Sequence, residues 1–157
     1  MTEQIFWVIL SSASPVFELR AGIPLGVLVF HLNPFWVFIV AVLSNFLIVP
    51  FLILFLKHFS EFFMHRFYFF NRLLNYIFLK TRDHHAHKFE KWEHWALLGL
   101  VAIPLPFTGA WTGALAAFLF DIPMKRALAV IFLGLVIAGI IVSGLTVFGN
   151  GALIGVK

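Results

Sequence analysis

Two long stretches without any ionisable side chain constrain the fold of this chain more than any other feature. They are residues 35–56, FWVFIVAVLSNFLIVPFLILFL, and residues 127–148, ALAVIFLGLVIAGIIVSGLTVF. About 20 apolar residues of α-helix cross the hydrocarbon core of a bilayer. The composition agrees, because 62% of the 157 residues are hydrophobic and only 11% are charged, whereas about a quarter of the residues in soluble domains are charged. The sequence therefore predicts an integral membrane protein with two long spanning helices.

A shorter, interrupted apolar region precedes each long stretch. Residues 5–32 are broken at SSASPVFELRAG, and residues 95–120 are broken at PLPFTGAWTG. The arms of these regions are marginal or too short to cross a bilayer, and irregular backbone at membrane depth is tolerated only where protein or water surrounds it. We therefore expect two re-entrant helical hairpins, which enter the membrane, turn and leave on the same side. The residues expected to form these hairpins are Pro15, Gly22, Pro24, Pro104, Pro106 and Gly113.

The two halves of the chain share a layout that suggests an internal repeat. Three residues recur 89 positions later (15 and 104, for example): Pro15, Ala21 and Pro34 match Pro104, Ala110 and Pro123. Basic side chains cluster in residues 57–94 and again at positions 125 and 126, and the positive-inside rule places both regions in the cytoplasm. The long helices would then run in opposite directions. The expected fold class is an all-α polytopic membrane protein with two inverted repeats, each a re-entrant helical hairpin followed by a transmembrane helix.

We expect one membrane domain over residues 1–157. Repeat 1 covers about 3–56, a cytoplasmic amphipathic linker covers about 57–91, and repeat 2 covers about 92–149. Polar residues in the linker recur near helical spacing among Phe and Leu, which favours a helix lying in the cytoplasmic interface. The alternative is a third spanning helix, which would spoil the antiparallel arrangement.

Glu18 and Arg20 place opposite charges beside the first break. A charge in the middle of a bilayer is costly, so such residues pair, face a cavity or have a function. We expect Arg20 to bind a phosphate or carboxylate, because its planar fork suits bidentate contact. Glu18 is the expected proton carrier, because a carboxylate removed from water takes up a proton more readily. The alternative is structural: an internal ion pair, or an arginine that caps hairpin carbonyls.

The second break combines hydroxyl groups with very small residues. We expect a substrate cavity opposite Arg20, lined by Thr108, Gly109, Trp111 and Thr112. The alternative for this segment is tight helix packing, because Gly and Ala let neighbouring helices approach closely.

Other chemistries find little support in the sequence. The chain contains no Cys, which excludes disulfides and thiolate sites. His87, Glu90 and His94 could share one helical face, but HExxH is absent and we expect no metal or other cofactor. No phosphate-binding loop or nucleophile elbow is present, so we expect neither an enzyme nor a nucleic-acid partner.

The segments PVFELRAGIPLG and PLPFTGAWTGALAAF resemble the small multidrug export protein family, which is distantly similar to the DedA (VTT-domain) membrane proteins. The resemblance covers nearly the whole chain. It implies hairpins that meet at the membrane centre, transport driven by an ion gradient, and a multi-pass location in the cytoplasmic (inner) membrane of a prokaryote. For DedA relatives the proposed cargo is a lipid, undecaprenyl phosphate or a phospholipid, and Glu18 and Arg20 match the charged residues of their first hairpin. Residues 104–117 lack the arginines of the second DedA hairpin.

We therefore expect an integral membrane transporter, coupled to protons through Glu18, that moves an anionic lipid or a small amphiphile. The alternatives are a passive lipid scramblase or channel, and a small-molecule drug efflux protein. The expected partners are the lipid bilayer, the substrate and protons. A homodimer would shield the hairpins of so short a chain from lipid.

Overall fold

The computed structural model describes residues 2–66, 89–105 and 108–154, and the regular structure within these ranges is helical. The expected all-α class is therefore confirmed. In chain order the helices are α1 (Thr2–Ala13), α2 (Glu18–Pro24), the π-helical turn η1 (Leu25–Val29), α3 (Pro34–Arg66), α5 (Phe89–Ala102), α6 (Ala110–Leu119) and α7 (Met124–Ile154). By length and composition α3 and α7 can cross a membrane, as the two apolar stretches predicted.

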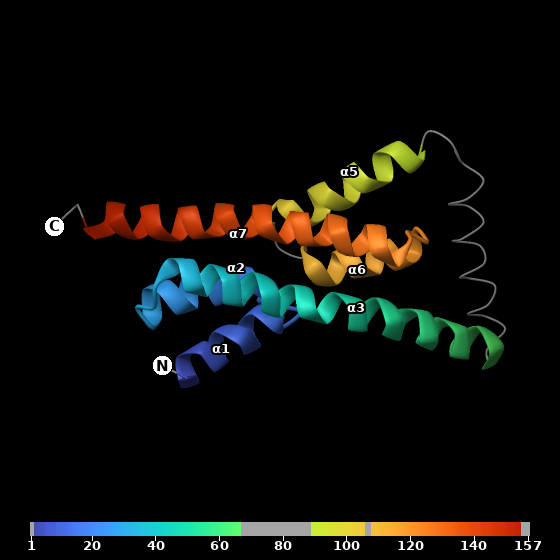
Figure 1. The fold of residues 1–157 in the computed structure, drawn as a ribbon, viewed down its shortest axis with the longest axis horizontal. Coiled ribbons are helices and arrows are strands. Elements are labelled where there is room, and N and C mark those ends of the chain that lie inside the picture. Colours follow the sequence, from blue (N-terminus) through green and yellow to red (C-terminus); the bar gives the residue numbers. More distant parts are fainter. Residues whose placement is uncertain (1, 67–88, 106–107, 155–157) are drawn as a thin grey trace.

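α3 and α7 pack side by side in opposite directions (Figure 1). The ring centroids of Phe46 and Phe132 lie 5.0 Å apart. Gly139 lies so close to the side chains of Phe38 and Val42 that an added Cβ would come within 2.7 Å of the Phe38 ring. Phe38, earlier in α3, thus contacts Gly139, later in α7, and Phe46 contacts Phe132, so the two helices are antiparallel.

α3 extends beyond the apolar stretch that predicted it. The helix continues through Lys57 to Arg66, so the beginning of the expected linker at 57–91 belongs to α3. Its 33 residues give a length of about 50 Å at 1.5 Å per residue, which exceeds the roughly 30 Å of a hydrocarbon core. Residues 67–88 of the expected linker lie outside the described residues.

Two pairs of short helices accompany the long ones. α1 and α2 have 12 and 7 residues, and α5 and α6 have 14 and 10, so each is shorter than the roughly 20 residues of a full span. The first break, residues 14–17, begins before Pro15, which disfavours helical backbone at the preceding residue. The Ser14 hydroxyl accepts a hydrogen bond from the Phe17 N–H at 3.1 Å, and the Ser14 carbonyl accepts one from the Glu18 N–H at 3.1 Å.

Pro24 lies inside the second arm of the first pair and not at its turn. The chain continues through Pro24 into η1, where the Phe30 N–H reaches back five residues to the Leu25 carbonyl at 3.1 Å. A proline inside a helix removes an N–H donor and clashes with the carbonyl four residues earlier. The wider π-helical turn that follows fits this disturbance of the α-helical ladder.

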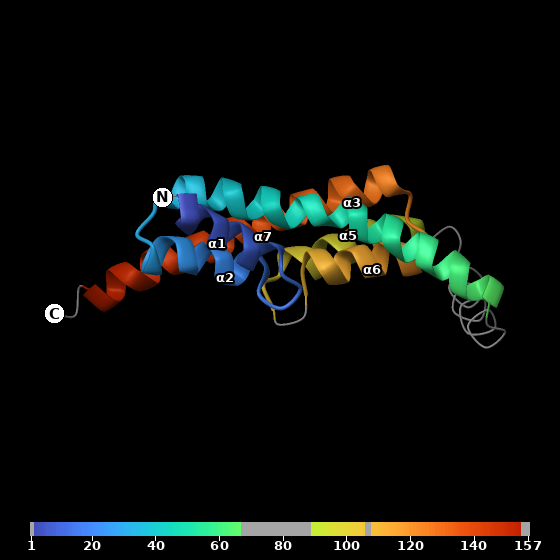
Figure 2. The ribbon, with the colours of Figure 1, turned by 90° about the horizontal axis from the view of Figure 1, so that it is seen from below.

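The long helices bring the two short pairs together. α2 contacts α1, α3 and α7, whereas α6 contacts α3, α5 and α7. Figure 1 shows α3 passing first along α2 and then along α6. Figure 2, a view from below, shows the turn after α1 beside the segment after α5. The first break therefore lies against the described part of the second break, residues 103–105 and 108–109, near the middle of the bundle.

Candidate substrate site between the two breaks

Glu18 begins α2 with its side chain buried against α6. Its residue is 5% exposed and has a φ of 51°, the left-handed region that side chains other than glycine rarely adopt. The Trp111 N–H, in the first turn of α6, donates to Glu18 Oε1 at 3.4 Å. A carboxylate at this position also faces the positive end of the α6 dipole. Glu18 therefore caps a helix that lies more than 90 residues away in sequence.

Gly109 makes this approach possible. Its φ of 134° is accessible to glycine and unfavourable for other residues. A Cβ built on Gly109 would lie 1.8 Å from Glu18 Oε2 and 2.5 Å from the carboxyl carbon. Gly109 is thus required twice, once by its own backbone and once by the carboxylate that occupies the space of a side chain.

Arg20, two residues after Glu18 in the first turn of α2, reaches the second break. Its Nη2 donates to both the carbonyl oxygen and the hydroxyl of Thr108, the latter at 2.7 Å. Thr108 Oγ1 also lies 2.8 Å from the carbonyl oxygens of Ile103 and Leu105 and accepts the Leu105 N–H at 3.2 Å. One threonine hydroxyl thus organises the irregular backbone of the second break and presents it to Arg20.

Trp111 and Thr112 complete the connection. The Trp111 indole N–H donates to the Ala13 carbonyl at 3.3 Å, which satisfies an acceptor at the C-terminal end of α1. The Thr112 hydroxyl donates to the Gly109 carbonyl at 3.3 Å. The hydrogen bonds of Glu18, Arg20 and Trp111 all join residues 13–20, around the first break, to residues 108–111, at the end of the second.

A cleft of about 550 Å³ opens between the breaks. Both charged side chains and both threonines border it, together with apolar groups. Its lining consists of Pro15, Val16, Phe17, Glu18, Arg20, Ala21, Pro104, Thr108, Trp111 and Thr112. An arginine has five N–H donors and both bonds to Thr108 use Nη2. The cleft therefore offers a small amphiphile a cationic fork, a carboxyl group and an apolar surface.

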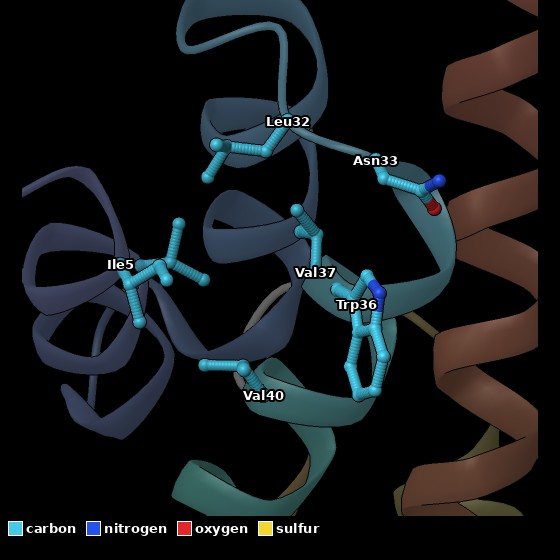
Figure 3. Close-up of a pocket in the computed structure, with 7 residues that line it drawn as sticks. Ile5, Leu32, Asn33, Trp36, Val37 and Val40 are labelled. Carbon is cyan, nitrogen blue, oxygen red and sulfur yellow. The ribbon is translucent and has the colours of Figure 1, made fainter. Parts of the chain in front are cut away.

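A second hollow, of about 370 Å³, lies between α1 and the start of α3 and is almost entirely apolar. Figure 3 shows Ile5 of α1 facing Val37 and Val40 of α3 across it. The polar side chain at its rim, Asn33, uses its Oδ1 to accept the Phe35 N–H at 2.9 Å. With no ionisable group in its lining, this hollow cannot supply the charge chemistry of the cleft between the breaks.

The structure places the predicted site residues in two groups. Lining the cleft or its edge are Glu18, Arg20, Thr108, Gly109, Trp111, Thr112, Pro15 and Pro104. The other expected hairpin residues lie within helices: Gly22 and Pro24 in α2, and Gly113 in α6. Gly22 packs on Ser12 and Gly113 on Val101, so these glycines serve helix packing. Pro106 lies outside the described residues.

Sequence reasoning missed the reason for Gly109. We expected it to line a cavity, but its contact is with the Glu18 carboxylate. The signal in the sequence was a glycine at the boundary between a Pro-rich break and an Ala-rich helix, which is where a positive φ is common. The histidines at 84, 85 and 87 lie outside the described residues, and within the described ranges no three His, Asp or Glu side chains gather as metal ligands do.

Residues 18–141 match the family model described as "Putative small multi-drug export protein". This match begins at Glu18, directly after the first break, and includes α2, α3, the second break and α7 as far as residue 141. No curated protein and no solved structure shows significant similarity to the chain.

Proposed function

The chain belongs to the small multi-drug export protein family, and from this premise we propose that it moves an amphiphile with an anionic head group across the membrane together with a proton. The cleft between the breaks is the proposed binding site. Arg20 binds the head group, Glu18 carries the proton, and Thr108 holds the guanidinium in place. The observation that carries the proposal is that Glu18 and Arg20 border the same cleft.

The proposed architecture is the inverted repeat. The two short pairs act as re-entrant hairpins, α3 and α7 as the spans, and the whole as a multi-pass protein of a prokaryotic inner membrane. The antiparallel long helices and the meeting of the two breaks support this arrangement. A site where broken helices meet at mid-membrane is typical of secondary transporters.

The charges of the cleft support coupled movement of an anion. With Glu18 ionised, the Glu18 and Arg20 pair is neutral overall. When Glu18 takes up a proton, the pair gains a net positive charge, which favours an anionic head group. The proton and the anion then neutralise the site together, and a neutral site crosses hydrocarbon at a lower cost than a charged one. An inward proton gradient would drive the head group inward.

The test uses the full chain in phosphatidylcholine proteoliposomes. One arm measures movement of NBD-labelled phosphatidylglycerol between leaflets by dithionite quenching, and another measures uptake of carboxyfluorescein, so a lipid and a soluble anion are distinguished. We expect one of these to accelerate under a pH gradient. Anion movement that ignores the gradient would instead indicate a passive scramblase or channel.

Variants sharpen this test. We expect Arg20→Ala to abolish movement of the anion and Glu18→Gln to abolish its dependence on the pH gradient. The matched controls are Lys125→Ala and Glu3→Gln, because both side chains are exposed and neither borders the cleft. Rates are normalised to the protein incorporated. Unchanged coupled transport in both cleft variants would refute the assignment.

A second candidate is export of a drug, which the family description favours, and the carboxyl group of Glu18 in the cleft favours a cationic one. Here the ionised Glu18 would bind the cation, and protonation would release it. An inward proton gradient would then drive the cation outward. Ethidium in the same proteoliposomes tests this alternative, because gradient-driven ethidium movement without anion movement would select it.

A further inference from the structure

The second hollow, between α1 and the start of α3, lies where the protein meets the bilayer. Its lining is apolar apart from Asn33 and the Trp36 indole N–H, and Figure 3 shows Ile5 on one side of it and Val40 on the other. Trp36, which forms part of the wall, is 64% exposed. The hollow is therefore continuous with the surface of α3 that faces lipid in a membrane.

Neither water nor empty space is a favourable occupant of this hollow. A buried water molecule needs about two to four polar partners, and the Ile, Leu and Val side chains of the wall offer none. An empty hollow would forfeit the dispersion contacts of the atoms that line it. The hydrocarbon of the bilayer can fill the hollow without either cost.

The hollow has the direction and size of a segment of acyl chain. Its α3 lining comes from positions 33, 36, 37 and 40, which share one helix face, so it extends about 10 Å along a spanning helix. Ile5 and Val8 line it from α1, and Figures 1 and 2 show that α1 and α3 begin at the same end of the molecule. A water molecule occupies about 30 Å³ of liquid and a methylene group a similar volume, so the hollow of about 370 Å³ holds on the order of ten methylene groups.

Two hydrogen-bond donors lie at one end of the hollow. Asn33 is exposed, and its Oδ1 accepts the Phe35 N–H at 2.9 Å, which leaves the amide nitrogen as a donor. Figure 3 shows the Trp36 indole nitrogen on the edge of its ring that lies toward Asn33. Asn33 directly precedes Pro34, the first residue of α3, and Trp side chains near the ends of spanning helices lie at the level of the lipid head groups. The phosphate of a phospholipid is an acceptor that matches these donors.

We propose that the hollow binds one acyl chain of a phospholipid whose phosphate accepts hydrogen bonds from the Asn33 amide and the Trp36 indole. The bound chain fills the space between α1, which is too short to span the bilayer, and α3. The hollow shares no lining residue with the cleft between the breaks. This lipid site is therefore separate from the proposed transport site and does not depend on the proposed function.

Native mass spectrometry of the full chain, released from phosphatidylcholine nanodiscs, tests the site. We expect one phospholipid to stay bound to each wild-type chain. Val40→Trp fills the hollow and should lose this lipid. Leu43→Trp is the matched control and should keep it, because Leu43 is 53% exposed on the same helix and lies outside the hollow. Equal lipid retention in the two variants, or a wild-type dimer that carries no lipid, would overturn the proposal.

A third variant tests the head-group contact. Asn33→Asp keeps an acceptor for the Phe35 N–H but replaces the amide donor by a negative charge, which repels a phosphate. We expect this variant to lose the bound phospholipid. Unchanged retention of phosphatidylcholine would overturn the assignment of the phosphate to this end of the hollow.

Photocrosslinking of the wild-type protein remains informative if a variant fails to fold. Phosphatidylcholine that carries a diazirine on one acyl chain is included in the nanodiscs, and the labelled residues are identified by peptide mass spectrometry. We expect labelling of residues 5–8 and 36–40 to exceed that of Leu133 and Ile140 on α7, which are 56% and 60% exposed but lie outside the hollow. Even labelling of these positions would overturn the proposal.

Discussion

Residues 14–20, the first break and the start of α2, carry two ionisable side chains, whereas residues 103–111, the second break and the start of α6, carry none. The first supplies Glu18 and Arg20, and the second supplies the groups that meet them: the Trp111 N–H, the Thr108 carbonyl and hydroxyl, and the empty side of Gly109. The two breaks are therefore complementary and not duplicates. The likeness of the two halves extends to the order of their helices and not to the chemistry of the site.

Because of this difference, we expect substitutions in the second break to act mainly by steric clash, and substitutions of the charged residues after the first break to act mainly through electrostatics. The largest expected effect is that of Gly109→Ala. The new side chain would be strained at a φ of 134° and would clash with the Glu18 carboxylate. Strained backbone costs about 1–3 kcal/mol and overpacking about as much, so we expect a loss of stability on the order of 3 kcal/mol or more, measured by thermal unfolding in nanodiscs.

Gly99→Ala is the matched control for that substitution. Gly99 lies within α5, and a Cβ there would meet nothing within 4 Å. Replacing a helical glycine that has free space for a Cβ by alanine raises stability by up to about 1 kcal/mol. If Gly109→Ala and Gly99→Ala changed the stability equally, the second break would have no special steric requirement at Gly109.

The next effect tests the electrostatic side. Arg20→Ala removes the hydrogen bonds to the Thr108 carbonyl and hydroxyl. Hydrogen bonds from charged groups contribute about 1.5–3 kcal/mol, and we expect a loss in this range, with Thr108→Val giving a smaller loss that is not additive with it. Arg126→Ala, at an exposed position of α7, should leave the unfolding midpoint unchanged.

A smaller effect is expected at Gly22, within the first pair of helices. Alanine there would place its Cβ 1.9 Å from Ser12 Oγ, but the backbone is helical and the serine hydroxyl can rotate away. Tight core sites lose about 1–3 kcal/mol on overpacking, and we expect the lower end of that range in the same unfolding assay. If Gly22→Ala lowered the stability as much as Gly109→Ala, the contact with the Glu18 carboxylate would not be the reason that position 109 requires glycine.

The smallest effect is expected for Trp111→Phe. This change removes the indole N–H that reaches the Ala13 carbonyl at 3.3 Å and keeps most of the apolar surface. The net contribution of a neutral hydrogen bond is about 1 kcal/mol, so the unfolding midpoint should fall slightly. Transport should persist, because the backbone N–H that meets Glu18 is unchanged. Loss of transport at full stability would place the indole in contact with the substrate.

Local sequence patterns predicted the long helices and the two breaks. They did not predict the part that each proline and glycine plays, or where α3 ends. The breaks were visible because Pro15 and Pro104 interrupt apolar runs, and the site was visible because charges are rare in such a chain. Pro24 and Gly113 misled us about the turns, because both residue types also occur inside membrane helices where neighbours compensate. The end of α3 was misplaced because its helix continues past Lys57, where hydropathy falls but helix propensity does not.

The sequence by itself determined that this chain is a helical membrane protein with two spans, two interrupted regions and a charged pair beside one of them. These properties follow from hydropathy, from proline stereochemistry and from the cost of a charge in hydrocarbon, all of which act locally. Only the tertiary structure decided that Glu18 caps α6 and that Arg20 holds Thr108. These contacts join residues that are distant in sequence, and they depend on the register in which the helices pack.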